Sequence, residues 1–476
     1  MTRIFGLFGK NDKDLALCMA KRMQHQNKYK VVFQNEKDFC MGVLGLHPDR
    51  FISHYKTLQA VWDGVCPLQL FNNVLPVVDT HICQQGRLAF AGITADGTFF
   101  VARDWLGIAP LYYIIDGSTF FFASEVKALL EISPQIKEFP PGHVYTSRGD
   151  WQEIILPKIE ELVQTVDEIA AQLKEMLRIA ISSQITIPSQ IYQNEYGVWL
   201  SGGLDSSIIA AFASQVCKRL HTFSVGFRDS PDLYFARKMA GHLNTIHHEK
   251  IVTFEDLLKV LRDVIYLLES FDALLIRSSL TNYILAQLTA NYVSEIFSGE
   301  GVDELFAGYA YLKNLSEEVL KEEVSVLPFR LHNTALQRVD RCTMAAGLSA
   351  HLPFLTAPFF NFLRCIPLKF KLYREWNKLP IEKWILRQAV KGILPQEILS
   401  RSKAKFWEGA GVGELFLQYA VKKISDSDFT KEQKLPDGTL LQSKEELMYY
   451  RIFCEKFGHI DISFVGRTRE KKEENL

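Results

Sequence analysis

Short apolar runs separated by turn residues fill the first 155 positions of the chain. Strands are predicted over 88–93, 99–102, 111–115 and 119–123. Asp-Gly pairs at 96–97 and 116–117 stand between these runs, and Asp-Gly in such a place is a strong hairpin signal. This part of the chain is therefore expected to be rich in β-structure, with a few helices.

The pattern changes at Thr165. The stretch 165–168 has the form of a capping box, and apolar residues then recur at helical spacing. Apolar strands are predicted at 198–200, 222–227 and 293–297, and they alternate with helices, one of which begins at Pro231. Strands separated by helices indicate a parallel sheet with crossover connections. The expected fold class is α/β, with a mostly helical last third.

A chain of 476 residues is expected to form two or three domains. We place their limits at 1–155, 165–455 and 456–476, the last being a charged, solvated tail. A net charge of -1 gives no basic surface for nucleic acid. No signal peptide is recognised, and no apolar run reaches the ~20 residues of a membrane helix. The eight cysteines form no Cys-x-x-Cys pair, so free thiols in a cytoplasmic protein are expected.

Residues 201–207 read Ser-Gly-Gly-Leu-Asp-Ser-Ser and stand between a predicted strand and a predicted helix. Glycines allow a sharp turn close to an anion, and free N–H groups at a helix N-terminus bind negative charge. The hydroxyls of Ser201, Ser206 and Ser207 add donors, while Asp205 suits a phosphate site if it holds Mg²⁺. The loop lacks the spacing and the Gly-Lys ending of a Walker A motif. It resembles the PP-loop of N-type ATP pyrophosphatases, which implies attack at the α-phosphate of ATP.

A second glycine-rich loop, 298–309, follows the third predicted strand and adds three carboxylates. Asp303 is a candidate second ligand of Mg²⁺, and Glu300 is a candidate for orienting substrate or handling a proton. Alone, such a loop reads as an acidic surface turn about as often as a site. Beside a PP-loop, its carboxylates favour metal-assisted chemistry on ATP.

The order of segments over 165–455 resembles the synthetase domain of asparagine synthetase B. The matching segments beyond the two loops include 223–226, 229–233, 276–279 and 401–406. A weaker match, at 103–112 and 124–129, reaches the N-terminal domain. The resemblance implies a C-terminal PP-loop domain with a helical extension and an N-terminal α+β domain like the glutaminase (Ntn-hydrolase) domain of class II amidotransferases.

The resemblance also implies roles for individual residues. Asp205 and Asp303 would hold Mg²⁺, Glu300 would assist formation of an acyl-adenylate, and Lys403 would stabilise charge developing on the phosphate. Arg277 would clamp a substrate carboxylate or an ATP phosphate. ATP, the expected second cofactor beside Mg²⁺, would contact residues of both loops and of two strands: Leu200, Ser201, Gly202, Gly203, Asp205, Ser206, Ser207, Val225, Ser298 and Gly299.

The N-terminal domain departs from the family pattern. The family's glutaminase uses a cysteine directly after the initiator Met, whose free α-amino group acts as base, but this chain has Thr2. The family's Asn-Gly-Glu segment, which binds glutamine, has no recognised counterpart, and 81–87 does not resemble it. We therefore interpret this domain as a degenerate glutaminase, with ammonia from solution or another amine as the nucleophile.

The substrate region departs as well. Leu274-Leu275 stands where the family commonly has hydroxyl residues. The family's Glu-Ala-Arg-Val-Pro-Phe-Leu-Asp reads here as residues 349–356, Ser-Ala-His-Leu-Pro-Phe-Leu-Thr, which loses three charged positions. Charges around a polar substrate are costly to remove, because binding partners are left unpaired. The carboxylate is therefore expected to be aspartate or a related, less polar acid.

Three hypotheses follow from the sequence. The leading one is a carbon–nitrogen ligase that adenylates a small carboxylate and transfers its acyl group to ammonia or another amine. A cyclase of the β-lactam synthetase type and a non-catalytic nucleotide-binding paralogue are the alternatives. The expected partners are small molecules, without nucleic acid or membrane. Family members often form dimers, which leaves a homodimer open.

Overall fold

The computed structural model describes residues 2–55, 58–64, 86–185, 195–375, 377–401 and 406–467. The chain divides into two compact units. The first contains Met1–Pro157, Phe329–Asp340 and Cys454–Gly466, and the second contains Lys158–Pro328, Arg341–Phe453 and Arg467–Leu476. Because both units are discontinuous along the chain, the contiguous limits expected from the sequence stay a prediction. In the described residues, no helix combines the length and apolar content that crossing a membrane requires.

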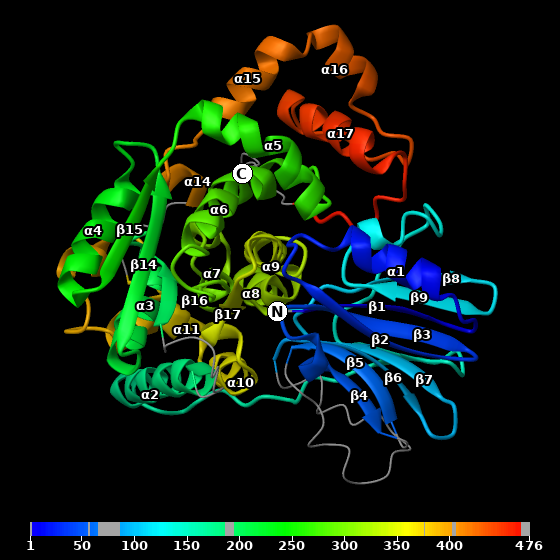
Figure 1. The fold of residues 1–476 in the computed structure, drawn as a ribbon. Helices are drawn as coiled ribbons and strands as arrows, with labels where there is room; N and C mark the ends of the chain where they lie inside the picture. The colour runs from blue at the N-terminus through cyan, green and yellow to red at the C-terminus, as the bar shows by residue number, and fades with distance from the viewer. Residues whose placement is uncertain are drawn as a thin grey trace. The chain divides into compact units, whose positions relative to one another are not determined.

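The first unit contains two six-stranded antiparallel sheets (Figure 1). One has the order β10-β8-β9-β1-β3-β2 and the other the order β12-β11-β7-β6-β5-β4. Their strands are β1 (Thr2–Phe8), β2 (Lys30–Glu36), β3 (Phe39–Gly45), β4 (Ile52–Tyr55), β5 (Leu58–Gly64), β6 (Leu88–Thr94), β7 (Phe99–Arg103), β8 (Tyr112–Asp116), β9 (Thr119–Ala123), β10 (Lys137–Glu138), β11 (His143–Thr146) and β12 (Trp151–Glu153). The predicted hairpins are present, since β6 pairs with β7 and β8 pairs with β9.

The two sheets of the first unit share one core. A single apolar cluster contains Ile4 and Val43 of one sheet together with Val61 and Val101 of the other. Helix α1 (Lys13–Arg22) begins at Asp12, whose side chain accepts a hydrogen bond from the Leu15 N–H, and it packs on β1 and β3. Two sheets packed around one core match the α+β domain expected for this half.

The second unit is built on a five-stranded parallel sheet, as predicted, and the α/β fold class is confirmed. The order is β15-β14-β13-β16-β17, with β13 (Glu195–Trp199), β14 (Arg219–Gly226), β15 (Ile246–Ile251), β16 (Glu295–Phe297) and β17 (Ser349–His351). Figure 1 shows α4 (Pro231–Leu243) on one side of this sheet and α6 (Ala273–Thr289) on the other. Sequence analysis missed β17, a three-residue strand that is too short to show periodicity.

Helices make up most of the rest of the chain. Helix α2 (Val166–Ile185) begins after Thr165, where reciprocal hydrogen bonds with Glu168 confirm the predicted capping box. The other helices are α3 (Leu204–Val216), α5 (Phe254–Leu268), α7 (Val302–Leu305), α8 (Glu317–Val326), α9 (Ala335–Ala346), α10 (Ala357–Cys365), α11 (Leu368–Lys371), α12 (Trp384–Ala389), α13 (Gln396–Ser400), α14 (Phe406–Gly409), α15 (Leu415–Lys423), α16 (Asp426–Glu432) and α17 (Lys444–Phe457).

The segment expected as a charged tail, 456–476, divides in the structure. Lys456 and Phe457 end α17, and Phe464 is buried against Tyr112 of the first unit, with ring centroids 5.8 Å apart. Residues 468–476, which carry most of its charge, lie outside the described part of the chain.

Candidate active site

The first loop of the site connects β13 to α3. Gly202 has a φ of +68°, and a Cβ there would lie 2.3 Å from the carbonyl carbon of Phe235. Only glycine therefore fits this turn. Gly203 is the N-cap of α3 and supplies no side-chain hydrogen bond to it. The first-turn N–H groups of α3, which lack partners within the helix, are thus available to an anion.

The three serines of this loop differ in their surroundings. The Ser206 hydroxyl accepts a hydrogen bond from the Ser201 N–H at 3.2 Å and lies 3.1 Å from the Ser201 hydroxyl oxygen. Both residues border the turn. Ser207 is fully buried within α3, so its hydroxyl faces the protein interior. Two of the three expected hydroxyl donors therefore lie at the loop in this conformation.

The second loop follows β16 and lies against the first. The Ser298 N–H donates to the His351 carbonyl oxygen at 3.0 Å, which fastens the loop to β17. A Cβ on Gly299 would lie 3.2 Å from the carbonyl carbon of Asp205, so the two loops touch at this glycine. Because parallel strands end at one edge of a sheet, β13 and β16 bring the two predicted motifs together.

The two predicted metal ligands, Asp205 and Asp303, converge on one cationic group. The ammonium nitrogen of Lys383 lies 2.8 and 2.7 Å from the two Asp205 carboxylate oxygens and 2.6 Å from Asp303 Oδ1. Hard oxygen donors that meet at one point are what Mg²⁺ requires, with phosphate oxygens and water completing its shell. The donor set therefore fits Mg²⁺. Sequence analysis did not find Lys383.

Further acidic groups surround this pair. Glu300 is partly exposed at the loop. Glu304 is buried. Its pKa is raised, mainly by burial and also by the negative charge of the neighbouring Asp303 carboxylate. The Tyr309 hydroxyl donates a hydrogen bond to Glu304, and burial raises the pKa of that phenol. Of the two glutamates, Glu300 is the partly exposed one, and it is the residue expected to act on substrate.

The remaining ATP-site predictions concern Leu200, Val225 and Lys403. Leu200 follows β13 and is hydrogen-bonded through its N–H to the Phe223 carbonyl oxygen at 2.8 Å, and Val225 lies in β14. Both side chains are buried beside the loop edge of the sheet. Lys403 lies outside the described residues. Arg401, two positions before it, is the nearest described residue on that side.

Arg277 has a different environment from the one expected. Its guanidinium forms a buried two-pronged ion pair with Glu445, with Nε 2.8 Å from Oε1. The Tyr449 hydroxyl also donates to Glu445, at 2.8 Å. The carboxylate that Arg277 clamps in the structure therefore comes from α17. A role of Arg277 in clamping a substrate carboxylate or an ATP phosphate stays a prediction.

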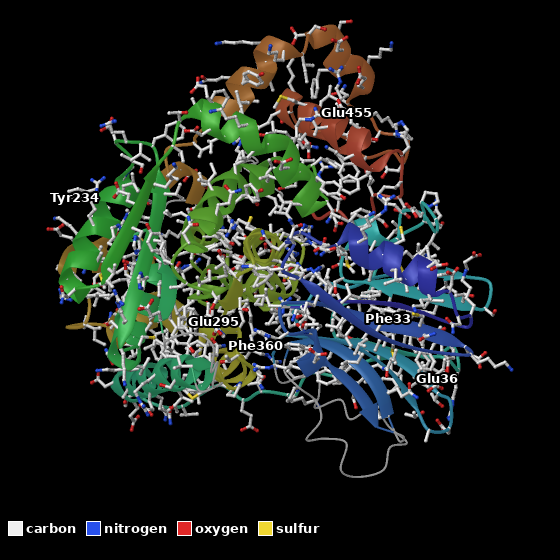
Figure 2. All side chains as sticks on the ribbon, viewed as in Figure 1. Phe33, Glu36, Tyr234, Glu295, Phe360 and Glu455 are labelled. Atoms are coloured by element: carbon white, nitrogen blue, oxygen red, sulfur yellow. The ribbon has the colours of Figure 1, made fainter. Side chains whose placement is uncertain are left out.

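The altered segment 349–356 lies next to the second loop. His351 pairs in register with Phe297, and its ring contacts those of Phe297 and Tyr196. Its Nε2 lies 2.8 Å from a carboxylate oxygen of Glu295, a residue labelled in Figure 2. Burial raises the pKa of Glu295, but this hydrogen bond and the attraction of nearby positive charges together lower it below its ordinary value. His351, which stands where the family has an arginine, therefore pairs with a glutamate of the neighbouring strand β16.

The position of the family's nucleophile is buried in the first unit. Thr2 is 1% exposed, and its hydroxyl donates to Asp63 at 3.0 Å. Asp63 is paired with Arg87 at 2.5 Å, and Arg87 is also paired with Asp340 at 2.7 Å. Arg3 continues the network through Asp340. Sequence analysis missed Asp63, which precedes a left-handed glycine at the end of β5.

Known proteins of one family are similar to most of this chain. The family described as "Asparagine synthase" matches residues 172–327 and 317–459, and the "Glutamine amidotransferase domain" matches residues 67–131. Asparagine synthetase (glutamine-hydrolyzing) 2 of Arabidopsis thaliana is 35% identical over 396 residues, covering 78% of this chain and 67% of that protein. Asparagine synthetase B (glutamine-hydrolyzing) of Escherichia coli strain K12 is 32% identical over 403 residues, covering 78% of this chain and 70% of that protein. The chain belongs to the asparagine synthase family of ATP-dependent ligases.

Proposed function

We propose that this chain uses Mg-ATP to adenylate a small carboxylate, aspartate or a related acid, and transfers the acyl group to an amine. A carboxylate oxygen attacks the α-phosphorus, the bond to the bridging oxygen breaks, and pyrophosphate leaves with the electron pair. The amine nitrogen then attacks the acyl carbon, the bond to the AMP oxygen breaks, and the nitrogen loses a proton. The products are an amide, AMP and pyrophosphate.

The observation that carries this proposal is the convergence of Asp205 and Asp303 on one cation position beside the N-terminus of α3. A phosphate bound by the α3 N–H groups would lie next to both carboxylates. Mg²⁺ held there would neutralise charge that develops on the phosphates. Asp205 and Asp303 follow paired strands of one sheet, so their positions relative to each other are fixed. This would orient the bound ATP toward the attacking carboxylate.

The other site residues receive roles that fit their places. Leu200 and Val225 form an apolar wall for the adenine and ribose, and Ser298 and Gly299 border the nucleotide. Glu300 takes part in forming the acyl-adenylate. Lys403 stabilises the departing pyrophosphate. Arg401, two positions earlier in the chain, lies at the loop, since its guanidinium donates to the Ser201 carbonyl oxygen at 3.0 Å.

We further propose that the amine is ammonia from solution or another free amine. The support is the threonine at position 2, where the family's glutaminase has a cysteine, and the bond of its hydroxyl to Asp63, a carboxylate already paired with Arg87. A nucleophile must reach the substrate carbonyl with its lone pair free. The Thr2 hydroxyl is hydrogen-bonded to Asp63, and the chain lacks a thiol at this position.

The test is release of AMP and pyrophosphate from Mg-ATP, screened over small carboxylates with ammonia or with glutamine. Asp205→Asn is expected to lower the rate at least about 100-fold, because several kcal/mol of charge stabilisation are lost. Asp116→Asn is the matched control, since Asp116 is exposed in a hairpin turn where asparagine is equally suited. Equal release by the Asp205→Asn and unchanged proteins would refute the proposal.

A further inference from the structure

The side chain of Lys383 is buried at the point where it contacts the carboxylates of Asp205 and Asp303. Its side chain is 2% exposed, against 17% for Asp205 and 15% for Asp303. All three of its short contacts, at 2.6 to 2.8 Å, are to carboxylate oxygens of the predicted metal ligands. Carboxylate oxygens are also the donors that a divalent cation prefers, so Lys383 and such a cation would compete for the same oxygens.

The backbone at Lys383 is in a strained conformation, and in this conformation the side chain reaches Asp205 and Asp303. Lys383 has φ +54° and ψ +31°, a left-handed conformation that is unfavourable for a residue with a side chain. Its N–H donates to the Phe306 carbonyl oxygen at 3.2 Å. The preceding Glu382 is held by Lys313 at 2.6 Å and by Arg387 at 2.8 Å. Strain that the surroundings maintain in this manner is typical of a functional position.

Gly308 leaves room for the contact. A Cβ on this residue would lie 2.2 Å from Asp303 Oδ1 and 2.3 Å from Lys383 Cε. Any larger residue would displace one of these two groups. The Gly308 N–H also donates to the Asp303 carbonyl oxygen at 2.7 Å, which fixes the glycine against the metal ligand. The backbones around Asp303, Gly308 and Lys383 are therefore all shaped around one ion pair.

We propose that Lys383 holds the two metal-binding carboxylates in the nucleotide-free protein in place of Mg²⁺, so that the metal binds only together with a triphosphate. This inference rests on the proposed ATP site. Without the ammonium, Asp205 and Asp303 would repel each other at short range in a partly buried place. A triphosphate supplies the ammonium with new anionic partners, which releases the carboxylates to the metal. Lys383 is thus a positioning residue that makes metal and nucleotide binding cooperative.

The first test uses the unchanged protein and Mn²⁺, whose free form is counted by its electron paramagnetic resonance signal. After the Mn²⁺ held by the analogue alone is subtracted with a protein-free sample, Mn²⁺ is expected to bind the protein at least tenfold more tightly in the presence of a non-hydrolysable ATP analogue than in its absence. Equal affinity with and without the analogue would overturn the inference. Because this test measures binding alone, its result is independent of whether any carboxylate is adenylated.

The second test compares Lys383→Gln with Lys378→Gln, which changes an exposed lysine paired with Glu375 in the same segment. Lys383→Gln is expected to bind Mn²⁺ without nucleotide at least tenfold more tightly than the control, and Mn²⁺ is expected to raise its melting temperature. Adding Asp205→Asn to Lys383→Gln should abolish the gain. An unchanged Mn²⁺ affinity in Lys383→Gln would overturn the inference, and a Lys383→Gln protein that folds only with Mn²⁺ would support it.

Discussion

Arg401 is hydrogen-bonded to Ser201, a residue 200 positions earlier in the chain, through a 3.0 Å contact from its guanidinium to the Ser201 carbonyl oxygen. The same guanidinium is paired with Asp232 at 2.5 Å and lies 4.4 Å from the centre of the Phe235 ring. One side chain therefore connects Arg401 to α4 and to the start of the turn that we propose to bind phosphate.

Arg401→Lys is expected to raise the KM for ATP about tenfold. A lysine keeps the charge, but it cannot serve the carbonyl oxygen, the carboxylate and the ring at once. A hydrogen bond to a charged group contributes about 1.5–3 kcal/mol. Steady-state pyrophosphate release measures the effect. Arg451→Lys, in an exposed pair with Glu432, should leave the KM unchanged. An unaltered KM in Arg401→Lys would show that this anchor is dispensable.

Gly202→Ala is expected to destabilise the protein by about 3 kcal/mol or more and to abolish nucleotide binding. The new Cβ would combine a left-handed backbone with a 2.3 Å approach to Phe235. Gly203→Ala is the neighbouring control, because its φ is -73° and its closest contact would be 3.3 Å from the Ser201 hydroxyl oxygen. Urea unfolding measures both variants. Equal stability of the two would contradict the turn geometry described above.

Thr2→Cys is expected to produce no glutaminase activity, although it introduces the family's nucleophile type. Asp63, the partner of residue 2, is already paired with Arg87, and no counterpart of the family's Asn-Gly-Glu segment is recognised to bind glutamine. Glutamate formation from glutamine measures the outcome, with ammonia-dependent AMP release as the control for folding. Glutamate formation by the unchanged chain or by Thr2→Cys would contradict the proposed use of a free amine.

Glu138 is expected to make the first unit sensitive to acid. Burial raises the pKa of Glu138, but His332 and Arg103 outweigh it and lower the pKa to about 2 from 4.5. The charged form therefore stabilises the fold by about 3 kcal/mol, an amount present above pH 4.5 and lost as the pH falls toward 2. In urea unfolding, the stability difference between the unchanged protein and Glu138→Gln should shrink over that range.

The matched control for this prediction is Glu153→Gln, at an exposed position of β12. Its stability relative to the unchanged protein should not vary with pH in the same window. A difference between the unchanged protein and Glu138→Gln that stayed constant from pH 5 to pH 3 would contradict the assigned ion pairs.

Local sequence signals predicted those parts of the fold that depend on neighbouring residues. The capping box at Thr165 and the Asp-Gly hairpins needed only a few adjacent positions. The meeting of Asp205 and Asp303 was also predictable, because both follow strands of one parallel sheet. Their role as metal ligands stays a prediction, as do the roles of the other site residues.

The partners of Lys383 and Arg277 could not be predicted in this way. Lys383 contacts Asp205, which is 178 residues away in the sequence. Its left-handed backbone could not be predicted either, because the residue is a lysine and not a glycine. Arg277 meets Glu445 across 168 residues. An arginine beside hydroxyl residues has the same local pattern whether its carboxylate partner is a ligand or another part of the chain. Long-range ion pairs of this kind depend on packing and leave no periodic signal.

The pairing of β13 with β16 has a consequence for folding kinetics. Val198 and Phe297 are neighbours in the sheet, yet the chain between them contains β14, β15 and the four helices α3 to α6. Contacts between distant positions form slowly, because closing a long loop costs entropy before the pairing is gained. The helices can therefore form during refolding before β16 docks. During refolding, the circular dichroism signal of the helices should recover first. Nucleotide binding should recover later, after β16 has paired with β13.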